Sequence, residues 1–371
     1  MALNFGINGD ISVKASRAVT VESTTPIAVV GTTNVGTLGL QFFGNVTLAI
    51  SAFAPAQGQT AQGTLLNALK AIDAQGVSCP LIVTALESEG ADADTVIAGV
   101  NALKTAEAVT GYRPNLIVAP EWSGTLSVAT AMDAVATKLW ATAIVDCTAD
   151  TESAALAFAA NFGSRFVLIV HPGEITLDNV AMPSSAAWAG LIAAMDAGST
   201  YGWTESASNR VVKSVSSTNR LIDYAEGQDS EARRLRNAGV NTIVCDVGWR
   251  SYGFETTDIE TIWQPLNRVR TFYKMLRGMI EAARYARDRK ADELLYVKRA
   301  IEEFMRGLKG AGVVLGFSAY FDTTKNTKTT VSNGQFYLTV EVQDMPTIRE
   351  LNIELTYVDD YSDVLLNIIN G

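Results

Sequence analysis

The chain has 371 residues, of which 48% are hydrophobic and 18% are charged, an ordinary globular composition with enough length for two or three domains. Its net charge of −10 at pH 7 argues against nucleic acid as a bulk partner, although a local basic face could still bind an acidic surface. No apolar run reaches the length of about 18 residues that a membrane span needs, and the N-terminal stretch MALNFGINGD lacks the regions of a secretory signal. We therefore expect a cytoplasmic protein without direct membrane insertion.

The cysteines Cys79, Cys147 and Cys245 are odd in number, far apart in the sequence and never part of a CxxC pair. This pattern indicates neither a disulfide framework nor a zinc site. We expect all three to be buried thiols.

Helical and strand patterns alternate between residues 65 and 170. The strands are short, continuous apolar runs, as expected when helices cover both faces of a parallel sheet. The pattern predicts a layered α/β domain. The predicted helices are Leu65–Gln75, Asp94–Val109, Ser127–Leu139 and Ser153–Phe162, and the predicted strands are Pro80–Leu86, Asn115–Ala119, Thr142–Asp146 and Arg165–Val170.

The character of the sequence changes after Ser184. A small-residue helix over Ser185–Asp196 leads into the polar, aromatic stretch YGWTESASNR. From Ile262 to Ala283 apolar residues recur at spacings of three and four, which predicts an amphipathic helix with one buried face. A second such helix and an α+β arrangement follow, with the helix predicted over Leu294–Lys309 and strands over Val313–Phe321, Gln335–Gln343 and Ile348–Val358.

Both ends of the chain carry alternating apolar and polar residues. Such strands can pair within their own subunit or be donated to the sheet edge of a neighbour, and the residues alone leave both possibilities open. The apolar positions are Ile11, Val13 and Ala15 near the N-terminus and Leu351, Ile353, Leu355 and Tyr357 near the C-terminus.

A search for catalytic chemistry finds little. His171 follows a predicted parallel strand, where α/β enzymes place ligands, but no G-x-S-x-G nucleophile motif accompanies it. We interpret it as a residue of a strand-end turn. Neither phosphate-binding glycine motif occurs, and the stretch Gly31–Leu40 lacks the required lysine, so its glycines are expected to serve turns. The carboxylates Asp359, Asp360 and Asp363 are more typical of a solvated end than of a calcium loop. We therefore predict no catalytic, cofactor or metal site.

The last predicted helix has a basic face. At about 100° per residue, Lys298, Arg299, Arg306 and Lys309 lie within one arc of about 100°, opposite the apolar residues Val297, Ile301, Phe304, Met305 and Leu308. Residues 263–310 contain twelve Lys and Arg against six Asp and Glu. Such charges are often only solvated, yet basicity concentrated in an acidic protein suggests a specific acidic partner.

Several segments in order resemble the contractile tail sheath proteins of myophages and R-type bacteriocins. They are RPNLIVAP at Arg113–Pro120, VATAMDAVATKL, AFAANFGSRFVLIVHPGE at Ala157–Glu174, YGWTESASN at Tyr201–Asn209, NAGVNTIVCDVGWRSYG at Asn237–Gly253, LNRVRTFYKML at Leu266–Leu276 and FMRGLKGAGVVLGFSAYFD at Phe304–Asp322. No single segment is a strong motif, but the ordered set spans most of the chain. Where family members commonly carry Asn-Arg-Thr, this chain has Phe254-Glu255-Thr256, which leaves open only the contact made there.

The resemblance implies a fold of the α/β plus α+β class, in which an outer βα layered domain is inserted into an inner α+β domain. The expected divisions are residues 1–25 as an N-terminal arm belonging to the inner domain, 26–198 as the outer domain, 199–346 as the inner domain, and 347–371 as a C-terminal arm strand and tail. It further implies that the terminal strands join the sheets of neighbouring subunits, and that the basic face of 294–309 grips the acidic outside of an inner tube.

By the same resemblance, the chain is a structural subunit and not an enzyme, with no cofactor. It would assemble with itself as a helical tube around an inner tail tube protein, and it would contact baseplate and tail terminator proteins. Contraction would drive the tube through the target cell envelope. The expected location is the virion tail or a bacteriocin particle, assembled in the bacterial host cytoplasm. Two alternatives stay open: the sheath of a type VI secretion-like injection system and an α/β ligand-binding enzyme.

Overall fold

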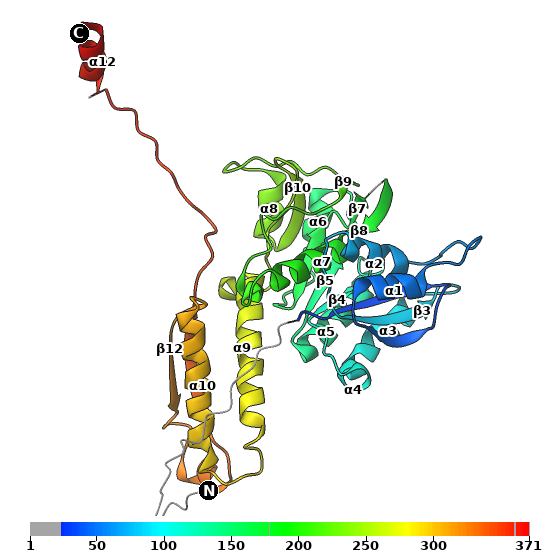
Figure 1. Cartoon of the computed structure of the whole chain (residues 1–371), viewed down its shortest axis with the longest axis vertical. Coiled ribbons are helices and arrows are strands. Elements are labelled where there is room, and N and C mark those ends of the chain that lie inside the picture. Colours follow the sequence, from blue (N-terminus) through cyan, green and yellow to red (C-terminus); the bar gives the residue numbers. More distant parts are fainter. Residues whose placement is uncertain (1–23, 178, 360, 371) are drawn as a thin grey trace, which may run out of the picture.

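The computed structural model of the chain describes residues 24–177, 179–359 and 361–370. Figure 1 shows an α/β body from residues 24–265, a stalk of two long helices and a β-hairpin from residues 266–346, and a C-terminal arm that extends away from both. The mixed architecture confirms the predicted fold class at this level.

The body is built around one eight-stranded sheet with the order β11-β10-β6-β5-β4-β1-β3-β2. The strands from β10 to β3 are parallel, whereas the edge strands β11 and β2 pair antiparallel. Strands β1, β4, β5 and β6 are buried throughout, as expected for a parallel sheet covered on both faces. The bounds are β1 Ile27–Thr33, β2 Gly39–Phe43, β3 Leu81–Glu87, β4 Leu116–Val118, β5 Thr142–Asp146, β6 Val167–His171, β10 Val240–Cys245 and β11 Trp249–Tyr252.

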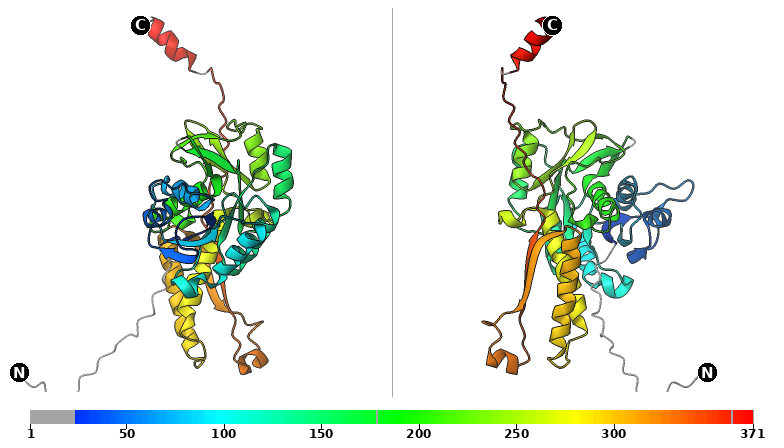
Figure 2. Two further views of the ribbon diagram at one scale, coloured as in Figure 1. Left: turned by 90° about the vertical axis from the view of Figure 1, so that its right-hand side faces the viewer. Right: turned by 60° about the vertical axis from the view of Figure 1, so that its left-hand side comes forward.

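Helices cover both faces of this sheet (Figure 2). Helix α2 packs against α1 and α7, and α3 packs against α5. Side-chain caps begin several of the helices: Asp92, for example, accepts a hydrogen bond from the Thr95 amide at 2.8 Å. The bounds are α1 Val46–Phe53, α2 Leu65–Asp73, α3 Ala93–Ala102, α4 Ala106–Thr110, α5 Leu126–Leu139, α6 Glu152–Ala159, α7 Ser184–Ala197 and α8 Glu231–Asn237, with 3₁₀ turns at Leu103–Thr105, Gly202–Thr204 and Thr261–Trp263.

The body also contains a smaller sheet, β8-β7-β9, and the stalk has its own two-stranded sheet. In the stalk, α9 and α10 pack with the hairpin around a second hydrophobic core that includes Met275, Val297, Ile301 and Met305. The periodic patterns of the sequence therefore predicted the stalk helices correctly. The bounds are β7 Glu174–Leu177, β8 Val180–Pro183, β9 Val215–Thr218, α9 Leu266–Arg284, α10 Glu293–Gly310, β12 Val314–Phe321, α11 Lys328–Ser332 and β13 Leu338–Asp344.

Buried polar contacts of α9 join the stalk to the body. The Arg270 guanidinium pairs with the Asp196 carboxylate at the end of α7, and both side chains are almost fully buried. Arg277 donates to the Asn115 side chain at 3.1 Å and to the Leu139 carbonyl at 2.9 Å. Breaking a buried ion pair leaves an uncompensated charge, so these contacts fix how α9 lies on the body.

The structure differs from the sequence predictions in several respects. The main sheet includes β10 and β11, so it crosses the boundary predicted between residues 198 and 199, because the later strands complete the hydrogen-bonding ladder beside β6. Cys245 is exposed at the end of β10, whereas Cys79 and Cys147 are buried as predicted. No strand forms over Ile348–Val358 in the single chain, because this segment has no neighbouring backbone to pair with; a short helix, α12 Ser362–Asn370, follows it.

Candidate interaction surfaces

The carboxyl ends of the parallel strands are occupied by the protein's own hydrogen bonds. His171 at the end of β6 is 1% exposed, and its Nδ1 lies 3.0 Å from the Cys147 carbonyl oxygen. Its Nε2 lies 3.1 Å from a nitrogen of Arg220, which also pairs with Glu231 at 2.5 Å. Burial lowers the pKa of His171, with a smaller contribution from the nearby Arg220 cation. These contacts agree with the interpretation of His171 as a strand-end residue.

Asp146 at the end of β5 has a similar structural role. Its carboxylate accepts hydrogen bonds from the backbone amide of Ser185 at 2.6 Å and from the Ser123 hydroxyl at 3.2 Å. Because Ser185 lies in the first turn of α7, the carboxylate sits at the positive end of that helix. Burial nevertheless raises the pKa of Asp146 to about 7, against hydrogen bonds that favour the charged form. Within the described ranges, no cluster of three or more His, Cys, Asp and Glu side chains could hold a metal ion.

The segment that leads into the C-terminal arm is held at three points. We call residues 344–349 the arm root. The Asp344 carboxylate at the end of β13 lies 2.8 Å from Nε of Arg268 on α9. The Met345 amide donates to the Val313 carbonyl at 3.1 Å. The third contact joins Arg349 to the body.

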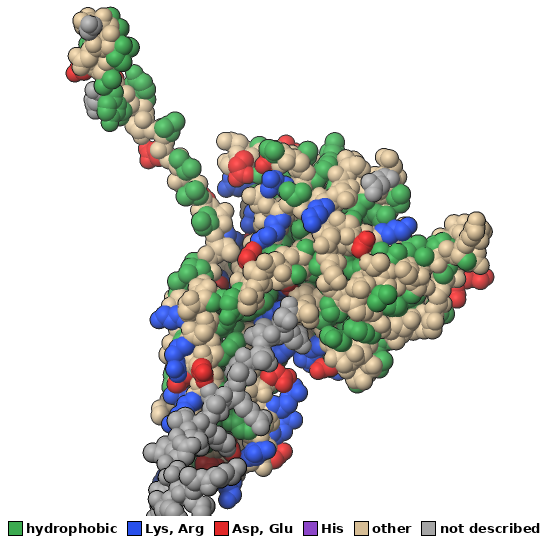
Figure 3. Space-filling model, viewed as in Figure 1, with side chains coloured by type: hydrophobic (Ala, Val, Ile, Leu, Met, Phe, Trp, Pro, Cys, Tyr) green, Lys and Arg blue, Asp and Glu red, His purple; other side chains and the backbone are tan. Residues whose placement is uncertain are grey.

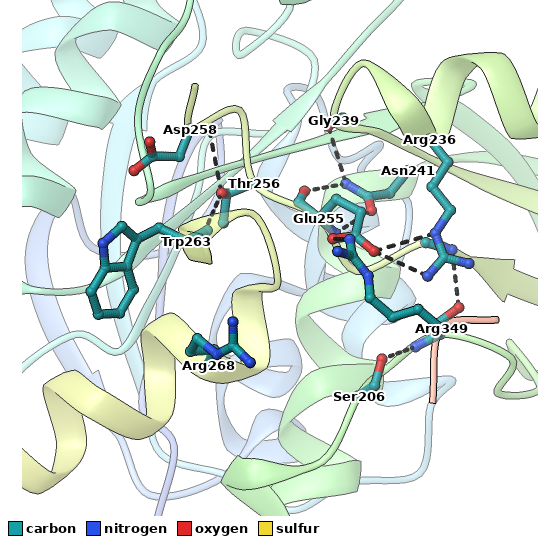
Figure 4. A network of polar contacts seen from close by, with 12 residues as sticks. Ser206, Arg236, Gly239, Asn241, Glu255, Thr256, Asp258, Trp263, Arg268 and Arg349 are labelled. Carbon is teal, nitrogen blue, oxygen red and sulfur yellow. Dashed lines mark hydrogen bonds and ion pairs between the residues drawn. The ribbon is translucent and has the colours of Figure 1, made fainter. Parts of the chain in front are cut away.

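Glu255 receives this third contact, and Figure 4 shows its carboxylate between two arginines. One oxygen accepts from Arg236 of α8 at 3.0 Å, and the other pairs with Arg349 of the arm root. The Glu255 side chain is 5% exposed, against 22% for Arg236 and 43% for Arg349. A carboxylate this buried requires paired cations, so it forms a specific anchor for the arm.

The backbone around Glu255 is fixed by Asn241 of β10. The Asn241 side chain accepts from the Glu255 amide at 2.7 Å and donates to the Glu255 carbonyl at 2.8 Å. Gly253 makes this close approach possible: its φ is +98°, and a Cβ there would lie 2.7 Å from the Asn241 side-chain oxygen. The backbone of the anchor is therefore fixed by residues of the body.

Beyond the arm root the chain is exposed. Among the predicted arm residues, Leu351 is 72% exposed, Ile353 83%, Leu355 96% and Tyr357 88%. Figure 3 shows hydrophobic side chains exposed along the extended segment. The residues Ile11, Val13 and Ala15 lie outside the described residues. An exposed alternating segment leaves its backbone donors and acceptors available for pairing with another sheet edge.

The basic face predicted on α10 lies at the surface. Arg299, Arg306 and Lys309 are exposed, and Lys298 is half-buried. The opposite face is buried as predicted except for Phe304, which is half-buried. Lys298 pairs with Glu302 at 2.8 Å, and Arg306 approaches the same carboxylate at 3.5 Å. Glu302, which the sequence analysis did not include, therefore partly neutralises the face. Figure 3 shows Lys and Arg side chains gathered over the stalk.

The Glu255 anchor was missed as a site by sequence reasoning. Its single sequence indication is the departure at Phe254-Glu255-Thr256. Arg268 and Asp344 carried no indication at all, since they lie 76 residues apart. Among the described residues, no helix combines the length and the apolar character needed to cross a membrane.

Comparison with solved structures identifies the fold. The helical sheath of the anti-feeding prophage in its contracted state matches with a TM-score of 0.73 over 97% of this chain and 100% of that chain, at 17% identity. The sheath of an extracellular contractile injection system, also contracted, matches with a TM-score of 0.70 over 97% of this chain and 100% of that chain, at 14% identity. The chain therefore has the fold of a contractile sheath subunit.

Sequence comparison places it in a family. The phage tail sheath protein central domain matches residues 95–250. A prophage major tail sheath protein of Pseudomonas aeruginosa is 34% identical over 80% of this chain and 80% of its own length. The tail sheath protein of Escherichia phage P2 is 25% identical over 84% of each chain. The chain belongs to the phage tail sheath family.

Proposed function

We infer that the chain is the structural subunit of a contractile tail sheath, many copies of which assemble into the sheath of a virion tail. The observation that carries this conclusion is the 34% identity to a prophage major tail sheath protein over 80% of both chains. The fold supports it across almost the whole chain. The family is structural, and the residues that an enzyme would use at the strand ends, Asp146 and His171, are engaged in internal hydrogen bonds.

We propose that the stalk faces an inner tail tube and that the body faces outward. This keeps the predicted division into an inner and an outer part but moves residues 199–265 from the inner to the outer part. The stalk carries the basic face Lys298, Arg299, Arg306 and Lys309, and residues 263–310 contain six more basic than acidic residues. An acidic tube surface would be attracted to it. Exposed ion pairs are individually weak and screened by salt, about 0 to 1 kcal/mol each, which suits a grip that holds in sum and releases on contraction.

The arms supply the second proposed contact. The segment 351–357 is exposed, alternating and anchored at its root, so it is suited to add a strand to the two-stranded hairpin sheet of a neighbouring stalk. Main-chain hydrogen bonds between the paired strands can persist while the side-chain contacts between neighbouring subunits change. Subunits linked in this way would stay connected while the sheath shortens.

The remaining partners follow from the same proposal. At its ends the sheath would contact baseplate and tail terminator proteins, and it would assemble in the host cytoplasm. The energy of contraction would be stored in the extended lattice, because subunits repack into a more tightly contacted arrangement without a cofactor or nucleotide.

Assembly with the native tube tests the proposal. The purified chain mixed with its native tail tube protein is expected to form helical particles in which one tube surrounds another, seen by electron microscopy. The tube alone should give only the thinner structure. A chain that stayed monomeric with its tube under all assembly conditions would contradict the proposed function.

A further inference from the structure

Helix α12 at the end of the arm has an apolar face that nothing in the single chain covers. At about 100° per residue, Val364, Leu365, Ile368 and Ile369 lie within an arc of about 140°, Leu366 extends this arc to about 200°, and Asn367 and Asn370 lie on the other side. The first four of these apolar side chains are 57%, 60%, 73% and 69% exposed. A helix of nine residues is marginal in water without packing, so α12 requires an apolar surface to pack against.

The stalk has an apolar cleft of matching character. A cavity of about 590 Å³ lies between α9, α10 and the hairpin, and apart from Arg165 its lining side chains are apolar or aromatic. Its lining includes Phe272, Leu276, Ile280, Leu338 and Val340. Leu276 and Ile280 are 42% and 41% exposed, so the cleft is open to an incoming side chain. A helix of nine residues is about 14 Å long, shorter than the roughly 23 Å spanned by the seven residues of β13.

We propose that α12 of one subunit packs its apolar face into this cleft on a second copy of the chain, the copy whose hairpin receives its arm strand. The inference rests on the proposed function, because it takes the exchange of the segment 351–357 as given. Residues 358–361 then span at most about 14 Å. Neighbouring strands lie about 4.8 Å apart, so a strand added to the hairpin edge brings α12 to the cleft that this hairpin lines.

The same length favours the receiving subunit's cleft over the donor's own. Once the segment 351–357 is paired on a neighbour, residues 358–361 keep α12 within about 14 Å of the receiving hairpin. The arm would therefore end in an apolar contact between α12 and the receiving subunit. The strand would supply main-chain hydrogen bonds, and α12 would add the burial of apolar surface.

Cross-linking in mixed sheaths tests the contact directly. One chain would carry Ile368→Cys and a second chain Ile280→Cys, each with the exposed Cys245 replaced by Ser. A short bismaleimide is expected to give sheath dimers only when both chains are assembled together. Asn367→Cys, on the polar face of α12, is the matched control and should give markedly less dimer. Cross-links to the tube, or within an unassembled chain that carries both cysteines, would overturn the proposal.

A second measurement uses charge. The double variant Leu365→Glu and Ile368→Glu should lower the temperature at which assembled sheaths dissociate, whereas Asn367→Glu and Asn370→Glu add the same charge to the polar face and should have little effect. Sheaths of equal stability for both pairs would count against the α12 contact. Failure of the unchanged chain to form any sheath would instead count against the proposed function, so the two failures are distinguishable.

Discussion

At the residue scale, Glu255 binds Arg349 of the arm root through an ion pair, although the Glu255 side chain is only 5% exposed. Glu255→Gln keeps the side-chain shape and the backbone contacts to Asn241 while it removes the attraction for both arginines. We expect hydrogen exchange of the Met345 amide, which donates to the Val313 carbonyl, to accelerate roughly 5- to 30-fold, the equivalent of about 1 to 2 kcal/mol, in the unassembled subunit. Hydrogen exchange followed by mass spectrometry measures this.

Two further substitutions separate the anchor from general stability. Arg349→Gln removes only the arm side of the contact and should reproduce the faster exchange with little change in melting temperature, since Arg349 is 43% exposed. Arg284→Gln removes an exposed pair with Glu281 on α9 and serves as the matched control. Unchanged exchange over the arm root in Glu255→Gln would show that Asp344 and Met345 hold it without Glu255.

This anchor also marks a limit of prediction from sequence at the residue scale. Glu255 lies 19 residues from Arg236 and 94 from Arg349, and no periodicity links residues so far apart. Only the fold brings them together. His171 was different, because its place after a continuous apolar run already indicated the end of a buried strand.

At the scale of secondary-structure elements, α10 allows a test of tube attachment. Changing Lys298, Arg299, Arg306 and Lys309 together to Glu leaves the buried face of Val297, Ile301 and Met305 intact, so the subunit should still fold. Attraction to an acidic tube would become repulsion, and the fraction of extended sheaths should fall, most strongly at low salt. Single substitutions should have little effect, at about 0 to 1 kcal/mol each. Electron microscopy at two salt concentrations gives these fractions.

Two control variants test whether the position of the changed charges on α10 matters, or only the net charge of the chain. Reversing four exposed cations of the body, namely Lys70, Lys104, Lys138 and Arg233, makes the same change in net charge away from the stalk. Glu302→Gln should raise the fraction of extended sheaths, whereas the quadruple variant should lower it, because the substitution frees Lys298 and Arg306 from their shared carboxylate. Equal fractions of extended sheath for all variants would leave α10 as an ordinary amphipathic helix.

Elements with a strong pattern could be predicted, and those without one could not. The strand over Thr142–Asp146 was predicted to the residue, and both stalk helices were predicted within a few residues. Strand β1 was missed although it lies inside the sheet between β4 and β3, because its apolar run is followed by a glycine-rich stretch that reads as loop. The arm segment 351–357 has a strand pattern without a strand, since pairing needs a second backbone that one chain does not supply.

At the scale of the whole molecule, rigid and extended parts are separated. The buried pair of Asp196 and Arg270 fixes α9 to the body, so body and stalk share a defined geometry. The arm begins at the anchored arm root and extends away from the body and the stalk, with its apolar residues exposed (Figure 1). A subunit built this way can keep its own fold while its connections to neighbours are made by the arm.

This separation predicts that proline substitutions in the arm abolish the linkage between subunits without changing the stability of the folded subunit. Replacing Ile353 and Leu355 with Pro removes two backbone donors and blocks ladder pairing, and it should abolish the linkage between subunits. The isolated subunit should melt as before, because both residues are more than 80% exposed in it. Removal of residues 11–21, outside the described residues, is expected to have the same effect on linkage.

The position of the prolines provides the control. Asp359→Pro lies beyond the segment 351–357 and should leave strand pairing intact, so its sheaths should resemble those of the unchanged chain in electron micrographs. The double proline variant should instead give separate subunits or short, disconnected rings around the tube, with unchanged melting of the free subunit. If it formed continuous sheaths that contract as normal, the arm strands could not be what joins the subunits, and the connections would have to come from the faces of the body.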